Sequence, residues 1–243
     1  MRRFKDKVVA VTGGSGAIGA ACVERFVAEG ARVASIDVAP ATAPPGGLAI
    51  TADFGRHEEI DRAFGQVALQ LGPIDVLVQS AAVLRPVPFL ELTPGDIDDV
   101  LAINVRGMLL AARWVAASLV RRQATGGVIV NLGSIASVVS DAASVPYDTS
   151  KGAVAMATRS LAVALAPHRI RVVSVVPGAM AKPQAGDARD PGDLDDYQRR
   201  RVPLGRWGVP ADVAGAVLFV ASEEAAYMTA SAVYVDGGTL AAY

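Results

Sequence analysis

Two kinds of hydrophobic block alternate along this chain. Short, almost uninterrupted apolar blocks rich in valine and isoleucine have the length and composition of buried strands. Longer blocks, whose apolar residues recur every three or four positions, have the period of helices that cover a core. The predicted strands are 7–12, 32–37, 48–52, 74–80, 128–132, 170–176 and 232–235. Because helical blocks separate most of these strands, we expect an α/β fold with a seven-stranded, mostly parallel sheet and helices on both faces.

The predicted helices are 17–29, 56–71, a long helix that begins after Thr93, one within 144–167, and 210–222. Thr93 is suited to cap its helix, because Pro94 and Asp96 follow in the first turn. No break in composition separates a second domain. We therefore expect one domain over 1–243, with a small polar substrate lid around 182–203.

Composition excludes several classes of function. The formal net charge is −1, so no positive field would attract nucleic acid, and the arginine runs at 121–122 and 199–201 are interpreted as solvated faces. The single cysteine, Cys22, forms no intrachain disulfide and is expected to be inert packing. The most apolar stretch, 100–120, contains Asn104, Arg106 and Arg113, so we expect no membrane span and a cytoplasmic location.

A glycine-rich turn at 12–19, TGGSGAIG, joins the first strand to the first helix. Glycine leaves room for a pyrophosphate to approach the backbone, and the helix N-terminus offers free N–H groups and a favourable dipole. The Ser15 hydroxyl adds a further donor. This strand, turn and helix predict a Rossmann-like, doubly wound dinucleotide-binding fold.

Asp37 ends the second strand, about twenty residues beyond the turn. A carboxylate there accepts hydrogen bonds from the adenosine ribose hydroxyls and repels a 2′-phosphate. No basic residue stands at Gly16 or Val38 to offset that repulsion. The predicted cofactor is therefore NAD rather than NADP.

Tyr147 and Lys151 are four residues apart and project from the same face of a helix. Free tyrosine, with a pKa of about 10, is a poor base near neutrality, but a nearby ammonium lowers the pKa and makes the phenol a usable acid/base. Ser134 follows the end of a strand, where ligands bind in open parallel sheets. Its hydroxyl can steady a substrate oxygen whose charge changes during reaction.

Taken together, these motifs resemble the short-chain dehydrogenase/reductase family in its single-domain form. The resemblance covers the chain from Lys7 to Gly238. The motifs that carry it are the turn at 12–19, Asp53, Asn104, Ser134, Tyr147 with Lys151, Pro177-Gly178 and 236–238.

The resemblance implies a catalytic set of four residues. Tyr147 would exchange a proton with the substrate oxygen, which Ser134 would hold. Lys151 would bind the nicotinamide ribose and lower the Tyr147 pKa. Asn104 would position a water that links Lys151 to solvent. The tail near Asp236 resembles segments that make subunit contacts, so a homotetramer or homodimer is expected.

The resemblance also implies a cofactor site that runs across the ends of the strands. Asp53 and Phe54 would lie along the adenine, and the segment after the fourth strand would pass near its ribose. The residues after Pro177 would shape the nicotinamide pocket. The implied cofactor-binding residues are Gly13, Ser15, Gly16, Ile18, Gly19, Asp37, Asp53, Phe54, Ser80, Ala81, Ala82, Tyr147, Lys151, Pro177, Gly178 and Met180.

The chain departs from the family pattern at a few positions. Ala17 and Ala82 stand where the family commonly has glycine, and Gln79-Ser80 stands where it commonly has two asparagines. Lys182 replaces a threonine that contacts the nicotinamide; it either points outward, which we prefer, or meets an anionic substrate.

These observations predict an NAD-dependent oxidoreductase, an alcohol dehydrogenase or ketoreductase that interconverts a secondary alcohol and a ketone. Fold does not fix function, so two alternatives stay open. One is an NAD-binding regulatory or scaffold protein, and the other is a non-redox lyase or isomerase of the same family type. His57 and His168 have no partners at metal-ligand spacing, and no metal site is expected.

Overall fold

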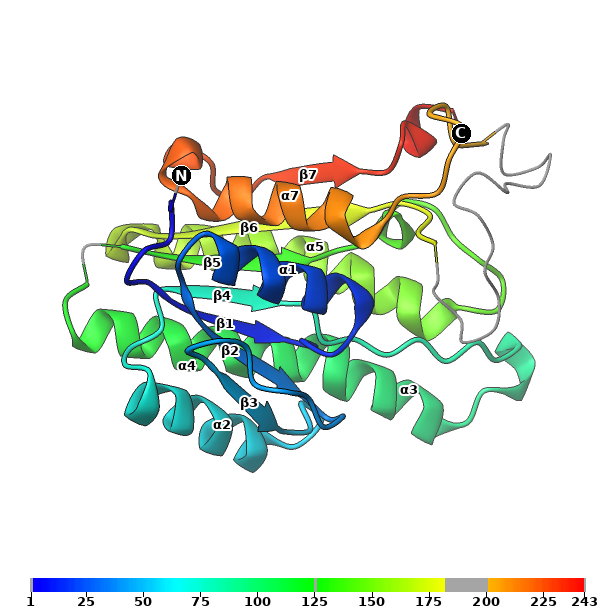
Figure 1. The fold of residues 1–243 in the computed structure, drawn as a ribbon. Coiled ribbons are helices and arrows are strands. Elements are labelled where there is room, and N and C mark those ends of the chain that lie inside the picture. Colours follow the sequence, from blue (N-terminus) through cyan, green and yellow to red (C-terminus); the bar gives the residue numbers. More distant parts are fainter. Residues whose placement is uncertain (1, 125, 182–200, 243) are drawn as a thin grey trace.

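A single seven-stranded sheet forms the centre of the molecule. In the computed structural model, residues 2–124, 126–181 and 201–242 are described. The strand order is β3-β2-β1-β4-β5-β6-β7, and every neighbouring pair is parallel (Figure 1). The strands are β1 Val8–Thr12, β2 Arg32–Asp37, β3 Leu48–Thr51, β4 Val76–Gln79, β5 Gly127–Leu132, β6 Ile170–Pro177 and β7 Ala232–Val235. The predicted doubly wound fold is confirmed, and the sheet is wholly rather than mostly parallel.

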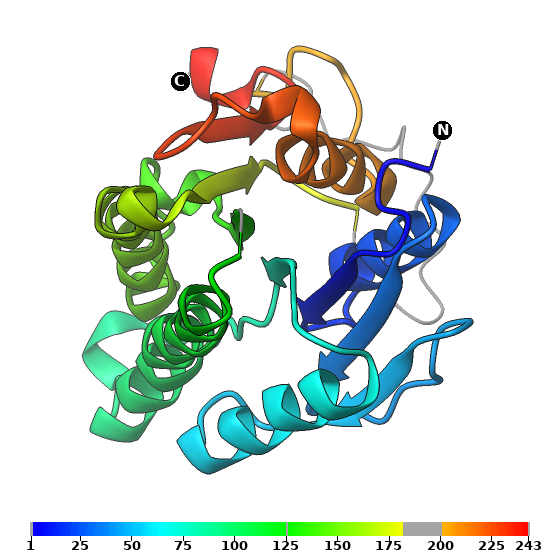
Figure 2. The same cartoon turned by 90° about the vertical axis from the view of Figure 1, so that its left-hand side faces the viewer.

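Helices cover both faces of this sheet (Figure 2). α1 (Ala17–Ala28) and α7 (Pro210–Ala221) pack against each other on one face. α2 (His57–Gln70), α4 (Met108–Arg121) and α5 (Val145–Leu165) cover the other, and α3 (Pro94–Leu101) packs on α5. The short helical turns are η1 Phe89–Glu91, η2 Ala102–Gly107, η3 Ile135–Ser137, η4 Ala166–His168, η5 Glu223–Ala225 and η6 Thr239–Ala241.

The two faces of the sheet bury separate apolar layers. Phe26 of α1 and Val217 of α7 are fully buried against strand valines such as Val130. On the opposite face, Phe64 of α2 and Val115 of α4 are fully buried in the second layer. Central strands are therefore apolar on both sides, which explains why their sequences show uninterrupted rather than alternating hydrophobicity.

The long helix predicted from Thr93 is confirmed as the continuous helical stretch Pro94–Arg121, which contains one irregular turn. Thr93 caps α3, and its capping box with Asp96 is complete. A π-helical turn, η2, then separates α3 from α4. Gly107 ends this turn so close to the Phe54 carbonyl that a methyl group there would overlap with it. Such π turns are rare and frequently lie at functional sites.

Among the described helical segments, the continuous stretch Pro94–Arg121 alone is long and apolar enough to span a membrane by length and composition. Its fully buried residues Ala111, Val115 and Leu119 belong to the apolar layer on the sheet. Helices buried in the core of a globular protein also meet these criteria of length and composition.

The carboxyl ends of all seven strands lie on one side of the molecule (Figure 1). The chain leaves β1 toward β2 on one side and reaches β4 on the other, so the strand order reverses beside β1. Ligands of open α/β sheets bind at such a reversal. Most of the predicted lid, together with Lys182, falls outside the described residues, which resume at Arg201.

Candidate active site

The glycine-rich turn after β1 packs tightly against the segment after β4. Gly13 has a φ of 67°, and a Cβ there would lie 2.6 Å from the Ala81 nitrogen. A methyl group on Gly19 would overlap with the Gly13 carbonyl. α1 starts at Gly16 without a side-chain cap, so its first N–H groups are available to an anion. This cradle fits a pyrophosphate.

The departures at Ala17 and Ala82 leave the backbone unstrained. Ala17 is the exposed first residue of α1, where its methyl group meets no obstruction in the turn. Ala82 is not among the described non-glycine residues with positive φ, which are Asp6, Gln123, Arg169 and Ala230. Glycine is therefore not required at either position for this fold.

A cavity of about 1010 Å³ opens beside this turn. It holds two carboxylates, those of Asp37 and Asp53, and no lysine or arginine among its described lining residues. The predicted cofactor residues on its wall are Gly13, Ser15, Gly16, Ile18, Asp37, Asp53, Phe54, Ser80, Ala81, Ala82 and Met180. Space and lining therefore suit a dinucleotide cofactor.

Asp37 is oriented by backbone groups. Its Oδ2 accepts a hydrogen bond from the Ser15 N–H at 2.9 Å, and its Oδ1 accepts one from the Ala39 N–H at 3.0 Å. Asp53 is held in the same way, because its Oδ1 accepts the Gly55 N–H at 2.8 Å. Both carboxylates thus have fixed positions on the cavity wall. Ser15 contributes its backbone N–H here, and the role of its hydroxyl as a donor to a phosphate remains a prediction.

The altered segment after β4 is anchored by hydrogen bonds across the sheet. Buried Gln79 donates through Nε2 to Asn131 Oδ1 at 3.0 Å, and Asn131 donates to Thr158 Oγ1 at 2.9 Å. The Ala81 N–H donates to Thr12 Oγ1 at 3.2 Å. Gln79 therefore ties β4 to β5. Asn131 was not singled out from the sequence, although a polar residue in a buried apolar strand is a signal for such a contact.

Tyr147 and Ser134 meet at the start of α5. Burial raises the Tyr147 pKa, a hydrogen bond with the Ser134 hydroxyl lowers it, and the Asp148 carboxylate raises it. The Lys151 Nζ lies 5.5 Å from the centroid of the Tyr147 ring. The sequence predicted a Tyr147 pKa lowered by Lys151. The structure instead shows a pKa raised mainly by loss of solvation, with Ser134 opposing that effect.

Lys151 reaches the end of β5. The residue is 4 % exposed, and its ammonium donates to the Leu132 carbonyl at 2.9 Å. Burial lowers its pKa from 10.5 to about 8. An ammonium has three donors, so Lys151 retains capacity to bind ribose hydroxyls from the end of β5. Leu132 was not predicted as a site residue, because a backbone acceptor leaves no mark in a sequence.

Asn104 lies in the π turn and holds the loop after β4. Its Oδ1 accepts the Val83 N–H at 2.8 Å, and its Nδ2 donates to the Val83 carbonyl at 2.9 Å and to Ser150 Oγ at 3.0 Å. The side chain is 2 % exposed. These three contacts make Asn104 a clamp between the loop and α5. Its predicted role in positioning a water remains a prediction.

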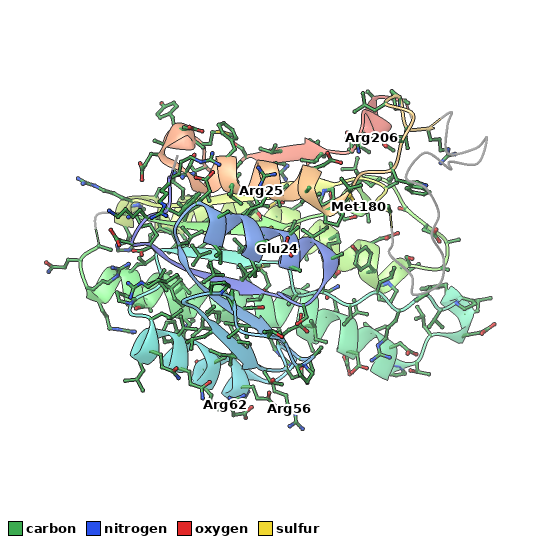
Figure 3. The ribbon with its side chains drawn as sticks, in the orientation of Figure 1. Glu24, Arg25, Arg56, Arg62, Met180 and Arg206 are labelled. Carbon is green, nitrogen blue, oxygen red and sulfur yellow. The ribbon has the colours of Figure 1, made fainter. Side chains whose placement is uncertain are left out.

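The segment after β6 forms the opposite wall. The Gly178 N–H donates to the Val235 carbonyl at 3.0 Å, which aligns Pro177-Gly178 with the end of β7. Met180 pairs in parallel with Gly208 and lines the cavity. Figure 3 shows Met180 on the same side of the molecule as Arg206, near the carboxyl ends of the strands. The segment therefore lies at the carboxyl ends of the strands, and its role in shaping a nicotinamide pocket remains a prediction.

The residues interpreted as non-functional lie away from this site. His57 and His168 are exposed, and within the described ranges no group of three or more histidine, cysteine or acidic residues has a metal-binding arrangement. Cys22 is fully buried in α1, and burial raises its pKa to about 12. A thiol in this environment is not a nucleophile.

Comparison with known proteins agrees with this geometry. A family model described as enoyl-(acyl carrier protein) reductase matches residues 13–239. The 2-(R)-hydroxypropyl-CoM dehydrogenase of Xanthobacter autotrophicus is 36 % identical over 246 residues, covering 96 % of this chain and 98 % of its own. The chain belongs to the short-chain dehydrogenase/reductase family. It is an oxidoreductase of that family.

Other members of the short-chain dehydrogenase/reductase family extend the comparison. Carbonyl reductase [NADPH] 2 of Sus scrofa is 33 % identical over 237 residues, covering 95 % of each chain. The crystal structure of gox2181 superimposes with a TM-score of 0.90 at 30 % identity, covering 99 % of this chain and 98 % of that one. The family binds a nicotinamide cofactor. Three features of this chain are compatible with such a cofactor: the uncapped N-terminus of α1, the close-packed glycine turn, and the cavity wall that contains Asp37.

Proposed function

We propose that this protein is an NAD-dependent dehydrogenase/reductase that interconverts a secondary alcohol and a ketone, with Tyr147 as the acid/base. The observation that carries the proposal is the meeting of Tyr147 with the Ser134 hydroxyl beside the Lys151 ammonium. Three groups with distinct chemistry converge there: a phenol that transfers a proton, a hydroxyl that holds an oxygen, and a cation.

In alcohol oxidation, the Tyr147 phenolate accepts the hydroxyl proton while Ser134 donates a hydrogen bond to the same oxygen. A nicotinamide cofactor, when bound, would supply the acceptor for the hydride that leaves the carbinol carbon. In the reverse direction, the neutral Tyr147 phenol donates its proton to the ketone oxygen. Because burial raises the Tyr147 pKa, the neutral form prevails near pH 7 in the protein alone, which favours proton donation to a ketone. Lys151 stabilises the phenolate that this donation leaves.

The choice of NAD rests on the charge of the cavity wall. Asp37 is fixed by Ser15 and Ala39, and no cation lines the described part of the cavity. A 2′-phosphate beside that carboxylate would be repelled without compensation. The relative named for NADPH does not change this reasoning, because it depends on Asp37 of this chain.

The proposed assembly is a homotetramer or homodimer. Met156 and Val163, seven residues apart on one face of α5, are exposed, and Leu109 and Val120 of α4 are exposed as well. Exposed apolar faces of this kind are typical of subunit interfaces. Light scattering after gel filtration should give a multiple of the chain mass, and a monomer mass contradicts the assembly.

The function is tested by turnover of a panel of secondary alcohols and ketones with NAD and NADH, followed at the NADH absorbance band. We expect activity that falls at least 100-fold in Tyr147→Phe, while NAD binding measured by calorimetry persists. Tyr234→Phe, at an exposed tyrosine of β7, is the matched control.

A crotonyl thioester in the same panel tests a different reaction, the reduction of a carbon–carbon double bond. This is the chemistry that the description of the matched family model names.

Three outcomes would redirect the proposal. NAD binding without any absorbance change across the panel favours the regulatory or scaffold alternative. Product formation without NADH accumulation favours a lyase or isomerase. Full activity of Tyr147→Phe on an accepted alcohol rejects the assigned acid/base.

A further inference from the structure

A second acid lies directly beside Tyr147 at the start of α5. Asp148 is partly buried, and its Oδ2 accepts the Asp141 N–H at 3.0 Å. Its own N–H donates to the Ser144 carbonyl at 2.9 Å. The carboxylate therefore folds back over the loop 138–144, which connects Ser134 and its short helix to Tyr147.

This contact is the first of a series that crosses to a second loop. The Asp141 Oδ1 accepts the Ala143 N–H at 2.9 Å, and the Ala143 carbonyl accepts the Val87 N–H at 3.0 Å. Val87 belongs to the loop after β4, whose near end Asn104 clamps at Val83. The two loops that flank the Ser134–Tyr147 pair are thus joined at Ala143, in the loop that the Asp148 carboxylate contacts.

The charge of Asp148 acts on the phenol at the same time. It raises the Tyr147 pKa, in addition to the effect of burial. On the elements packed against α5, Asp98 of α3 and His168 of η4 are exposed, and Arg171 of β6 donates to backbone carbonyls. Further charged groups on these elements have other partners. Asp96 of α3 accepts from Thr93, Asp99 of α3 pairs with Arg85 at 2.8 Å, and Arg106 of η2 donates to the Gly55 carbonyl. The short helix η3 carries no charged residue.

We propose that Asp148 is a positioning residue of the active site, whose carboxylate fixes the loop 138–144 through the Asp141 N–H and places a negative charge next to Tyr147. The catalytic consequence rests on the proposed function. The fixing of the loop and the effect of the charge on Tyr147 do not rest on it, because both are properties of the protein without substrate. Asp148 thereby adjusts the site toward ketone reduction and moves alcohol oxidation to higher pH.

Two variants separate the effects of charge and hydrogen bonding. Asp148→Asn removes the charge but keeps an oxygen that accepts the Asp141 N–H, whereas Asp148→Ala removes both. Asp98→Asn neutralises an exposed carboxylate on α3 and is the matched control. Circular dichroism and thermal unfolding establish that each variant is folded.

The charge effect is measured by NMR of the protein labelled at tyrosine Cζ, with Tyr147→Phe assigning the resonance. We expect ionisation of Tyr147 to begin at lower pH in Asp148→Asn and Asp148→Ala than in wild type and Asp98→Asn. The loop effect is measured by amide hydrogen exchange, where Asp141 should exchange at least tenfold faster in Asp148→Ala and be largely restored in Asp148→Asn. Unchanged Tyr147 ionisation in Asp148→Asn, or unchanged Asp141 exchange in Asp148→Ala, overturns the proposal.

The two proposals fail in different experiments. Neither NMR nor exchange requires turnover, so a shift in Tyr147 ionisation stands even if no alcohol is oxidised. Conversely, a Tyr147-dependent activity whose pH profile is identical in wild type and Asp148→Asn leaves the function intact and rejects the role of Asp148.

Discussion

The side-chain amide of Asn104 donates to the Ser150 hydroxyl at 3.0 Å, and that hydroxyl donates to the Tyr147 carbonyl at 2.7 Å. The π turn is thereby connected to the first turn of α5, on which the acid/base lies. Asn104 and Ser150 are both buried, so solvent does not replace a lost partner at low cost.

The Asn104–Ser150 contact should be measurable as an energetic coupling. Asn104→Ala also leaves the Val83 N–H and carbonyl without their partner, and we expect a loss of about 2–4 kcal/mol in the free energy of unfolding. Ser150→Ala removes two hydrogen bonds, the one from Asn104 and the one to the Tyr147 carbonyl, and should cost about 1–3 kcal/mol. Urea unfolding of the single and double variants should show a coupling of about 1 kcal/mol, and additive losses would contradict the contact.

Ser134→Ala should affect both the rate and its pH dependence. The Ser134 hydroxyl lowers the Tyr147 pKa, so its removal raises that pKa further. The rise of alcohol oxidation with pH should therefore move to higher pH, and kcat/KM should fall about 100-fold because the substrate oxygen loses a donor. Ser160→Ala, at an exposed position of α5, is the control. A lower rate with an unshifted profile would show that Ser134 does not act on the phenol.

Lys151 should make stability depend on pH in an unusual direction for a lysine. Its folded pKa of about 8 lies below the ordinary 10.5, so the unfolded chain binds more protons between these values. Burial of the charge therefore costs stability below about pH 8, and the cost disappears as pH rises toward 10.5. The shift corresponds to about 3 kcal/mol.

The free energy of unfolding of wild type and of Lys151→Met is measured from pH 7 to pH 10.5, and the difference between the two proteins is compared across this range. The contributions of other titrating groups are common to both proteins and cancel in the difference. Wild type should gain stability relative to the variant across the window. Lys5→Met, at an exposed lysine, is the matched control. A flat difference for Lys151→Met would show that Lys151 titrates normally.

Asp37 should determine the cofactor. Asp37→Asn keeps the shape of the side chain but removes the charge that opposes a 2′-phosphate. We expect the ratio of kcat/KM for NAD to that for NADP to fall at least tenfold, with NAD affinity also reduced because Asn offers one acceptor oxygen instead of two. Asp61→Asn, on the exposed face of α2, should leave the ratio unchanged. A ratio unaffected by Asp37→Asn would place the selectivity elsewhere.

Much of the fold was already predictable from local patterns. Buried parallel strands must be apolar on both faces, so β1, β5 and β6 appear in the sequence as continuous runs of valine and isoleucine. The helix start at Thr93 was equally visible, because capping is a local arrangement of hydrogen bonds. The π turn η2 within this helix was not, because it lies where Gly107 approaches the Phe54 carbonyl, far away in sequence.

For the site, the sequence by itself determined which chemical groups are available: a glycine turn before a helix, Asp37 at a strand end, and Tyr147 four residues before Lys151. Only the tertiary structure decided their environment. Burial sets the direction of the Tyr147 and Lys151 pKa shifts, and Leu132, Val83 and Asp141 take part through backbone atoms that every residue possesses. Desolvation and backbone contacts depend on which segments pack together, and that is a property of the folded chain.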